Sequence, residues 1–298
     1  MPEITKIGVV GCGLMGHGIT QVSAAAGYDV VVIDKDDDLL AKGMGKIDKQ
    51  LARAVEKGRS SQEDADAVRG RIQTTTELAD LADAGLIIEA ITENVEEKLT
   101  VWNKLDEAVN ADAYFASNTS SLPIIQMAAA TSRPERFLGL HFFNPAQVMK
   151  LVEVVRCVTT SDETISVGLE YTQKLGKLGV ETKDKAGFIV NRLLVPYFLD
   201  GMRAFEEGVG TIEEIDAAMK AGAGHPMGPL ELADFVGHDT TGAICDVLFD
   251  EFREKRFARP PILNKLLFAG WFGRKSGMGF YDYSGDKPVP NPGVEAQR

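Results

Sequence analysis

Three glycines within six residues, placed directly after a short apolar run, constrain this chain more than any other feature. The run spans residues 7–10, and Gly11, Gly13 and Gly16 follow it in the order Gly-Cys-Gly-Leu-Met-Gly. This order predicts a buried strand, a tight turn and the first turn of a helix. The first glycine permits the bend, the second leaves room for phosphates beside the backbone, and the third lets helix and strand pack closely. The stretch therefore predicts a helix start that binds an anion.

A carboxylate follows the second apolar run at the distance that a dinucleotide site requires. Val30–Ile33 ends in Asp34, which lies 34 − 13 = 21 residues after Gly13. A carboxylate here accepts hydrogen bonds from ribose hydroxyls and repels a 2′-phosphate, so Asp34 predicts NAD rather than NADP as the cofactor. Lys35 would soften that repulsion. The alternative is that Asp34 only caps the helix that follows it.

Composition and charge exclude several classes of protein. The 298 residues, 44% of them hydrophobic, suffice for a large core and suggest about two domains. The net charge of −12 argues against nucleic acid or an anionic membrane as a partner, and no apolar run is long enough to span a membrane. So few residues precede the first strand that we expect no targeting peptide, and hence a cytoplasmic protein.

The cysteines give no sign of a metal site or a disulfide framework. Cys12, Cys157 and Cys245 are odd in number and far apart in the sequence. No cluster of residues has the spacing of metal ligands. We therefore expect reduced cysteines and no metal.

Strand and helix patterns alternate through the first part of the chain, and a helical pattern follows. Further strands are expected at residues 71–76, 85–90, 113–117 and 137–142, and helices at 38–58, 95–110 and 122–130. This alternation predicts an α/β fold, a Rossmann-type doubly wound, mostly parallel sheet with helices on both faces. From residue 186 only helices are expected, one of them opened by a capping box at Thr211–Glu214. We predict an NAD-binding domain at 1–185 and an all-helical domain at 186–298.

A row of basic residues lies along one face of the helix expected at residues 38–58. Spacings of three and four residues place them opposite an apolar face, which is formed by Leu40, Met44, Ile47, Leu51 and Val55. This basic stripe consists of Lys42, Lys46, Lys49, Arg53 and Lys57. It is either an ordinary solvated face or, in so acidic a chain, a site for a phosphate-bearing substrate.

Two polar clusters follow strands of the predicted sheet, Ser-Asn-Thr-Ser-Ser and His-Phe-Phe-Asn-Pro. Ligands of such sheets bind beyond the carboxyl ends of the strands, so His141 is placed to remove the proton of an alcohol during its oxidation. Glu153, an acid within an apolar strand, needs a partner when buried and is a candidate to hold the second nitrogen of that ring. The alternatives are that backbone groups satisfy a packed His141, and that Ser120 or Ser121 only caps the next helix.

Several short motifs are distributed along nearly the whole chain. They are the glycine turn at 11–16, the polar clusters at 117–121 and 141–145, Phe-Ile-Val-Asn-Arg at 188–192, His-Pro-Met-Gly-Pro at 225–229, Gly-Arg-Lys-Ser-Gly at 273–277 and Gly-Phe-Tyr at 279–281. As a set they resemble the 3-hydroxyacyl-CoA dehydrogenases, most nearly the short bacterial enzymes for 3-hydroxybutyryl-CoA. The resemblance implies NAD-linked interconversion of an (S)-3-hydroxyacyl-CoA and its 3-keto form, by a homodimer joined through the helical domain.

The resemblance also implies roles for individual residues. His141 would be the general base, Glu153 its orienting partner, and Ser120 a hydrogen-bond partner of the substrate oxygen. From the second domain, Asn191 would position the thioester. Cofactor contacts would come from Gly11, Gly13, Leu14, Met15, Gly16, Asp34, Glu93, Lys98 and Asn118. Further contacts with the coenzyme A thioester would come from Lys49, Arg53, Lys57 and Asn144.

Gly224 departs from the family pattern, because many relatives have asparagine before the His-Pro-Met-Gly-Pro run. The acyl preference therefore stays open between 3-hydroxybutyryl-CoA and 3-hydroxyadipyl-CoA or longer chains. Related branches serve as a structural lens crystallin or oxidise a sugar acid, and both are alternatives here. We interpret His225 as structural rather than as a substrate contact, and His17 and His238 as ordinary histidines.

Overall fold

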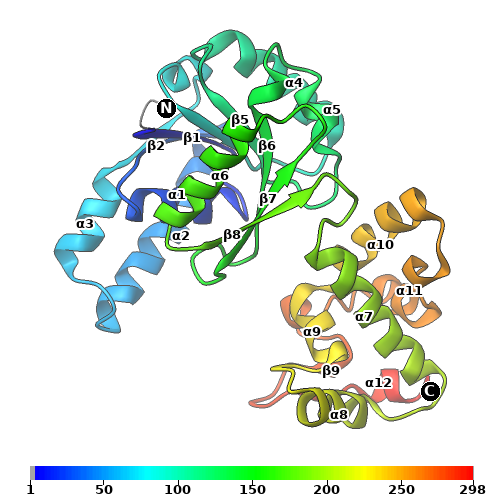
Figure 1. The fold of residues 1–298 in the computed structure, drawn as a ribbon. Coiled ribbons are helices and arrows are strands. Elements are labelled where there is room, and N and C mark those ends of the chain that lie inside the picture. The colour runs from blue at the N-terminus through cyan, green and yellow to red at the C-terminus, as the bar shows by residue number, and fades with distance from the viewer. Residues whose placement is uncertain (1–3, 298) are drawn as a thin grey trace. The chain divides into compact units, whose positions relative to one another are not determined.

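The computed structural model describes residues 4–297 and divides into two compact units. The first unit ends at Phe188 and the second begins at Ile189, three residues beyond the domain boundary predicted from the sequence. Figure 1 colours the first unit from blue to green and the second from green to red. Each unit has its own secondary structure and is described by itself.

An eight-stranded sheet forms the centre of the first unit (Figure 1). Its strands are β1 Lys6–Val10, β2 Asp29–Ile33, β3 Ile72–Thr75, β4 Leu86–Glu89, β5 Tyr114–Ser117, β6 Phe137–Phe142, β7 Leu151–Arg156 and β8 Leu178–Lys183. The spatial order is β3-β2-β1-β4-β5-β6-β7-β8, and the neighbours are parallel except β6 and β7. The predicted mostly parallel α/β sheet is confirmed.

Helices cover both faces of this sheet. They are α1 Gly16–Ala25, α2 Asp37–Glu56, α3 Gln62–Gly70, α4 Val95–Ala108, α5 Ile124–Ala128 and α6 Asp162–Lys174. Successive residues of β2 point to opposite faces: Val30 and Val32 pack with α1, α2 and α6, whereas Val31 and Ile33 pack with α4 and α5. This doubly wound arrangement leaves the ends of the strands as the places where polar side chains gather.

One edge of the sheet collects the carboxyl ends of β1, β2, β4, β5 and β6, which are parallel to one another. The antiparallel neighbour β7 brings a later residue to this edge, because its register places Glu153 opposite His141. The edge therefore carries both polar clusters and the glycine turn.

The second unit is mainly helical. Its helices are α7 Val190–Glu206, α8 Ile212–Ala223, α9 Pro229–Val236, α10 His238–Phe252, α11 Pro261–Phe268 and α12 Pro292–Glu295. The predicted capping box is present, since Thr211 and Glu214 bond reciprocally at the start of α8. The prediction of helices alone omitted a short antiparallel pair, β9 Tyr281–Asp282 and β10 Val289–Pro290. Short 3₁₀ turns occur in the first unit at Leu78–Leu81 and Pro134–Arg136, and in the second unit at Lys255–Phe257 and Arg274–Ser276.

A buried carboxylate organises the second unit. Asp234 accepts hydrogen bonds from the amides of Phe280 and Tyr281, at 2.9 Å each, and pairs with the fully buried ring of His238 at 2.6 Å. A Cβ atom at Gly273 or at Gly279 would lie 2.2 Å from atoms of Asp234. These contacts give the two glycine-containing motifs near the C-terminus and His238 a structural role.

His225 also has a contact within the second unit. Its Nδ1 lies 2.8 Å from the hydroxyl oxygen of Tyr197, which belongs to α7.

Across residues 4–297, every helix is too short or too polar to cross a bilayer.

Helix α2 packs against the glycine turn through a glycine of its own. A Cβ atom at Gly43 would lie 2.2 Å from Sγ and 2.3 Å from the backbone oxygen of Cys12. A backbone atom cannot rotate away from such a clash, so this position requires glycine. Gly45, in the same helix, has nothing within 4 Å of the corresponding position.

We therefore expect opposite effects from two matched substitutions. Gly43→Ala should lower the free energy of unfolding by about 1–3 kcal/mol, the usual cost of overpacking. Gly45→Ala should raise it by about 0.5–1 kcal/mol, because alanine favours an exposed helix position. Urea unfolding measures both. A Gly43→Ala variant as stable as the parent would contradict the close packing of α2 on the turn.

Candidate active site

The glycine turn connects β1 to α1 and has the geometry of a phosphate-binding turn. Gly11 has a φ of +97°, and a Cβ atom there would lie 2.8 Å from the backbone oxygen of Ala90. A Cβ atom at Gly16 would lie 1.7 Å from the oxygen of Gly11, whereas the space beside Gly13 is open. The first and third glycines are thus required by the fold, and the second faces space that a ligand can use.

The start of α1 carries free amide groups. Met15 occupies the N-cap position without a capping side chain, and the first turn contains no acid. The first-turn N–H groups and the helix dipole therefore favour an anion at this end. Leu14, before it, is 65% exposed. These residues fit the pyrophosphate of a dinucleotide.

Asp34 holds the glycine turn rather than the helix after it. Its carboxylate accepts hydrogen bonds from the amides of Cys12, at 2.7 Å, and Lys35, at 2.8 Å. The following helix α2 is capped instead by Asp36, which accepts from the amide of Leu39. The capping alternative for Asp34 is therefore wrong. Each carboxylate oxygen retains lone pairs for a ribose hydroxyl.

Cys12 is a chemically quiet neighbour of this site. Its side chain is buried, and burial followed by the charge of Asp34 raises the pKa of the thiol to about 11. The thiol therefore stays protonated at neutral pH, which makes it a poor nucleophile and a poor metal ligand.

His141 and Glu153 form a buried pair across β6 and β7. Nδ1 of the ring lies 2.7 Å from Oε2 of the carboxylate, and the two residues are 5% and 0% exposed. Because a carboxylate accepts at Nδ1, that nitrogen carries the proton and Nε2 is left as an acceptor. No group within residues 4–297 forms a hydrogen bond with Nε2. The partner is a side chain, so the alternative of a histidine satisfied by backbone is wrong.

Asn118 links the two polar clusters. Its side-chain oxygen accepts a hydrogen bond from the amide of Phe142, at 3.0 Å, and so joins the end of β5 to the end of β6 beside His141. Asn144 lies two residues beyond Phe142, is exposed and precedes Pro145. The predicted cofactor residue and the predicted substrate residue thus stand at one edge of the sheet.

Glu93 gathers the first polar cluster around one carboxylate. Oε1 accepts from the hydroxyl of Thr119, from the amide of Ser120 at 2.9 Å and from the hydroxyl of Ser121 at 3.3 Å. Burial raises the pKa of Glu93, but the charge of Lys98 and the hydrogen bonds from Thr119 and Ser120 outweigh it and hold that pKa below its ordinary value. Glu93 therefore stays ionised and fixes the backbone that carries Ser120.

Lys98 is buried between two carboxylates. It is 1% exposed, and its ammonium contacts Glu89 and lies 3.2 Å from Oε2 of Glu93. Glu89 also accepts from the hydroxyl of Ser117 at 2.7 Å and from the amide of Ile91 at 2.8 Å. The chain of contacts runs from the end of β4 to the polar cluster after β5.

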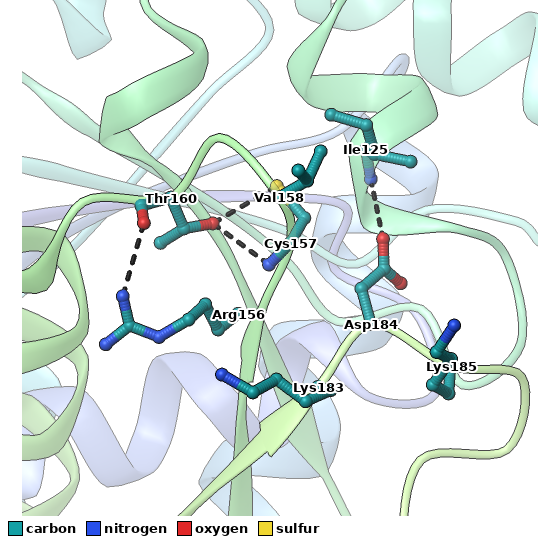
Figure 2. Close-up of a pocket in the computed structure, with 8 residues that line it drawn as sticks. All are labelled: Ile125, Arg156, Cys157, Val158, Thr160, Lys183, Asp184 and Lys185. Atoms are coloured by element: carbon teal, nitrogen blue, oxygen red, sulfur yellow. Dashed lines mark hydrogen bonds between the residues drawn. The ribbon is translucent and has the colours of Figure 1, made fainter.

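The serines of the first cluster do not cap α5, so that alternative is wrong. The amides of Ile124 and Ile125 donate instead to the carboxylate of Asp184, at 3.0 and 2.9 Å. Figure 2 shows the second of these bonds, between Ile125 and Asp184. Thr119 accepts from the amide of Leu122 at 3.0 Å. Asp184 lies 60 residues from Ile124 in the sequence, and sequence reasoning missed it because no local pattern marks a cap from so far away.

A pocket of about 470 Å³ lies near this cap, and none of the predicted site residues is among the residues that line it (Figure 2). It lies where β7 and β8 end. Because β7 runs antiparallel to β6, these ends are at the edge of the sheet opposite His141. The guanidinium of Arg156 in this pocket is already paired with Glu181 and Asp162. The pocket is therefore separate from the candidate active site.

The five residues of the basic stripe are exposed, four of them on α2 and Lys57 directly after its last residue, while Leu40, Met44 and Ile47 are buried beneath them. None of the five forms an ion pair with another residue of the described chain. The stripe is therefore available to an anionic ligand.

The predicted substrate residue Asn191 lies in the second unit, in the first turn of α7.

Replacement of Lys98 tests the buried charge network. Lys98→Met leaves carboxylates without their cation and should lower the free energy of unfolding by about 3–5 kcal/mol at neutral pH. Lys104→Met, in the same helix but exposed, should change it by less than about 0.5 kcal/mol. Urea unfolding of the three proteins gives the comparison.

The loss should depend on pH. With Lys98 present, the lowered pKa of Glu93 contributes stability above the unfolded pKa of about 4.3, and this contribution disappears as the pH falls through the folded pKa. Without Lys98 the carboxylate should have a raised pKa, which destabilises the fold only above about pH 4.3. The difference in the free energy of unfolding between the parent protein and Lys98→Met should therefore become smaller as the pH falls below 5. A difference that becomes larger in acid would refute the buried charge network.

Comparison with known proteins identifies the family. The NAD binding domain of 3-hydroxyacyl-CoA dehydrogenase matches residues 6–185, and the C-terminal domain of 3-hydroxyacyl-CoA dehydrogenase matches residues 187–283. Together these matches cover nearly all of both units.

Individual relatives are similar over almost the whole chain. A 3-hydroxybutyryl-CoA dehydrogenase from Bradyrhizobium diazoefficiens is 47% identical, with 96% of this chain and 98% of that protein covered. The human mitochondrial hydroxyacyl-coenzyme A dehydrogenase is 44% identical, with 94% and 91% covered. The crystal structure of (S)-3-hydroxybutyryl-CoA dehydrogenase from Ralstonia eutropha has a TM-score of 0.91 at 40% identity, with 95% and 100% covered. The chain therefore belongs to the 3-hydroxyacyl-CoA dehydrogenase family and is an NAD-dependent enzyme of that family.

Proposed function

We propose that the enzyme interconverts (S)-3-hydroxybutyryl-CoA and acetoacetyl-CoA. The family gives the reaction class, and the names of bacterial relatives that are 40–47% identical support the four-carbon substrate. The observation that carries the assignment is the buried pair of His141 and Glu153, with Nε2 of the ring left as an acceptor. An alcohol oxidation requires such an acceptor for the hydroxyl proton.

His141 acts as the general base in this proposal. Nε2 takes the proton of the 3-hydroxyl group during oxidation and returns it during reduction. Glu153 keeps the proton on Nδ1 and stabilises the imidazolium that forms. NAD, when bound, supplies the acceptor for the hydride that leaves the same carbon. Burial of both residues keeps water away from the pair and strengthens their interaction.

Ser120 and Asn191 position the substrate in this proposal. The hydroxyl of Ser120 bonds to the 3-oxygen, because Glu93 fixes the backbone that carries it. Asn191, from α7, bonds to the thioester in this proposal, and Asn144 supplies a further contact with the substrate. We further propose that Lys98 acts through Glu93 rather than by touching the cofactor, since its ammonium is buried between two carboxylates.

Cofactor recognition rests on the first strand and its turn. Gly11, Gly13 and Gly16 bring the backbone to the pyrophosphate, with Leu14 and Met15 supplying amides of the same turn. Asp34 selects the free ribose hydroxyls of NAD over the 2′-phosphate of NADP. Asn118 and Glu93 lie at the nicotinamide end, because both stand at the carboxyl ends of the middle strands.

The basic stripe binds the phosphates of coenzyme A in this proposal. Lys49 and Arg53 on α2 and Lys57 at its C-terminal cap are exposed and form no ion pairs with other described residues. Unpaired cations on an acidic protein attract a ligand that carries several phosphate charges. Their contribution depends on salt, because exposed charges are screened.

We also propose that the enzyme is a cytoplasmic homodimer joined through the helical unit. Several large apolar side chains of that unit are exposed, among them Leu193 at 65% and Phe268 at 92%. Such side chains favour burial against a second copy. Light scattering of the purified protein should give twice the mass of one chain.

Replacement of the base tests the mechanism. His141→Gln should lower the turnover of acetoacetyl-CoA reduction by about 100-fold or more, the range of general acid–base catalysis. The dissociation constant of NADH, measured by fluorescence, should stay unchanged because His141 does not belong to the glycine turn. Near-normal turnover of this variant would refute the assignment of His141 as the general base.

Charge removal tests the substrate assignment. Arg53→Ala combined with Lys57→Ala should raise the KM for acetoacetyl-CoA about tenfold at low salt, with less effect as the salt concentration rises. A truncated acetoacetyl thioester without the phosphoadenosine should show no such change. Equal effects on both thioesters would mean that these residues do not bind coenzyme A.

A further inference from the structure

Phe188, the last residue of the first unit, has a backbone conformation that its side chain disfavours. Its φ is +45°, and Arg253 is the one other residue besides glycine with a positive φ in the described part of the chain. A left-handed conformation is unfavourable for a residue with a bulky side chain. Such strain persists where the surroundings fix it, and it occurs preferentially at functional sites.

The surroundings fix Phe188 from two sides. Its amide donates to the backbone oxygen of Lys185 at 2.8 Å, after Gly187, which has a φ of +74°. Asp184, at the start of this turn, accepts from the first amides of α5. The side chain is 5% exposed and packs in the core cluster that includes Ile124. The hydrogen bond of the turn therefore fixes the backbone of Phe188, and packing in the core fixes its ring.

The ring of Phe188 contacts the catalytic imidazole. The centroids of the His141 and Phe188 rings are 5.4 Å apart, and Phe143 contributes a second contact at 4.6 Å. The ring planes are inclined by 55° in both pairs. These distances are those of attractive aromatic pairs.

One hydrogen bond does not fix the direction of an imidazole. Glu153 fixes the position of Nδ1, but the ring can still tilt about that contact and swing Nε2 away from the substrate. Contacts on the ring itself oppose such a tilt. A displacement of about 1 Å at a reacting atom can lower a rate by about 100-fold.

We propose that Phe188 is a positioning residue that fixes the ring plane of His141 and thereby aims Nε2 at the substrate oxygen. The proposal rests on the assignment of His141 as the general base. It gives the strained conformation a reason, because a relaxed backbone at this position would carry the ring away from the imidazole. Replacement of the ring should therefore slow the chemical step and leave cofactor binding unchanged.

Phe188→Leu tests the proposal, with Phe137→Leu as the matched control. Phe137 is a buried phenylalanine of β6 that packs against Trp102 and Phe115. Phe188→Leu should lower kcat about tenfold, change the KM for acetoacetyl-CoA less than threefold and leave the NADH dissociation constant unchanged. Phe137→Leu should lower the melting temperature but keep kcat within about twofold. An unchanged kcat in Phe188→Leu would overturn the proposal.

A double variant separates action through His141 from a general packing effect. If Phe188 acts through the imidazole, Phe188→Leu should change the residual turnover of His141→Gln by less than twofold, because the aimed atom is already gone. Multiplying effects would overturn the positioning role while leaving the base assignment intact. Near-normal turnover of His141→Gln alone would instead refute the proposed function.

A second substitution covers the case in which Phe188→Leu does not fold. Phe188→Met preserves most of the buried volume with a flexible side chain but removes the ring. The same fall in kcat and the same non-additivity with His141→Gln are expected. Full activity of Phe188→Met would overturn the proposal.

Discussion

The hydrogen bond between Glu153 and His141 is the contact on which the site depends. It exists because β7 reverses direction beside β6, so that a residue twelve positions later in the chain stands directly opposite the histidine. A buried carboxylate without a partner would be costly, and the imidazole supplies that partner. The same contact settles which ring nitrogen carries the proton. The stability of the fold and the proposed proton transfer therefore both require the hydrogen bond between Glu153 and His141.

Carboxylates repeatedly join segments that are far apart in the sequence. Asp34 holds the glycine turn, Glu93 the polar cluster after β5, and Asp184 the start of α5. Asp216 and Asp234 do the same within the helical unit. Each accepts backbone N–H groups that the fold would otherwise leave unpaired. Part of the net charge of −12 therefore has a structural purpose, and the exposed basic stripe on α2 stands out against it.

The sequence predicted those features that depend on local pattern. The glycine turn, the alternating strands and helices, the capping box at Thr211 and the apolar strand around Glu153 each follow from a few neighbouring residues. The cap that Asp184 provides, the role of Glu93 as a centre of hydrogen bonds, and the pair of His238 with Asp234 could not be predicted in this way. These contacts depend on tertiary packing, and β9 and β10 are too short to produce a pattern. Asp34 shows the limit clearly, because the sequence left helix capping open as its alternative role, whereas Asp36, two residues later, is the cap.

The direction of Nε2 in the working enzyme decides whether this account holds. A crystal structure of the enzyme with NADH and acetoacetyl-CoA measures it directly. We predict that Nε2 of His141 lies within about 3.2 Å of the 3-oxygen of the substrate, with Glu153 still bonded to Nδ1. An imidazole turned away from the substrate, or a 3-oxygen bonded to some other acid or base, would contradict the role of His141 as the general base.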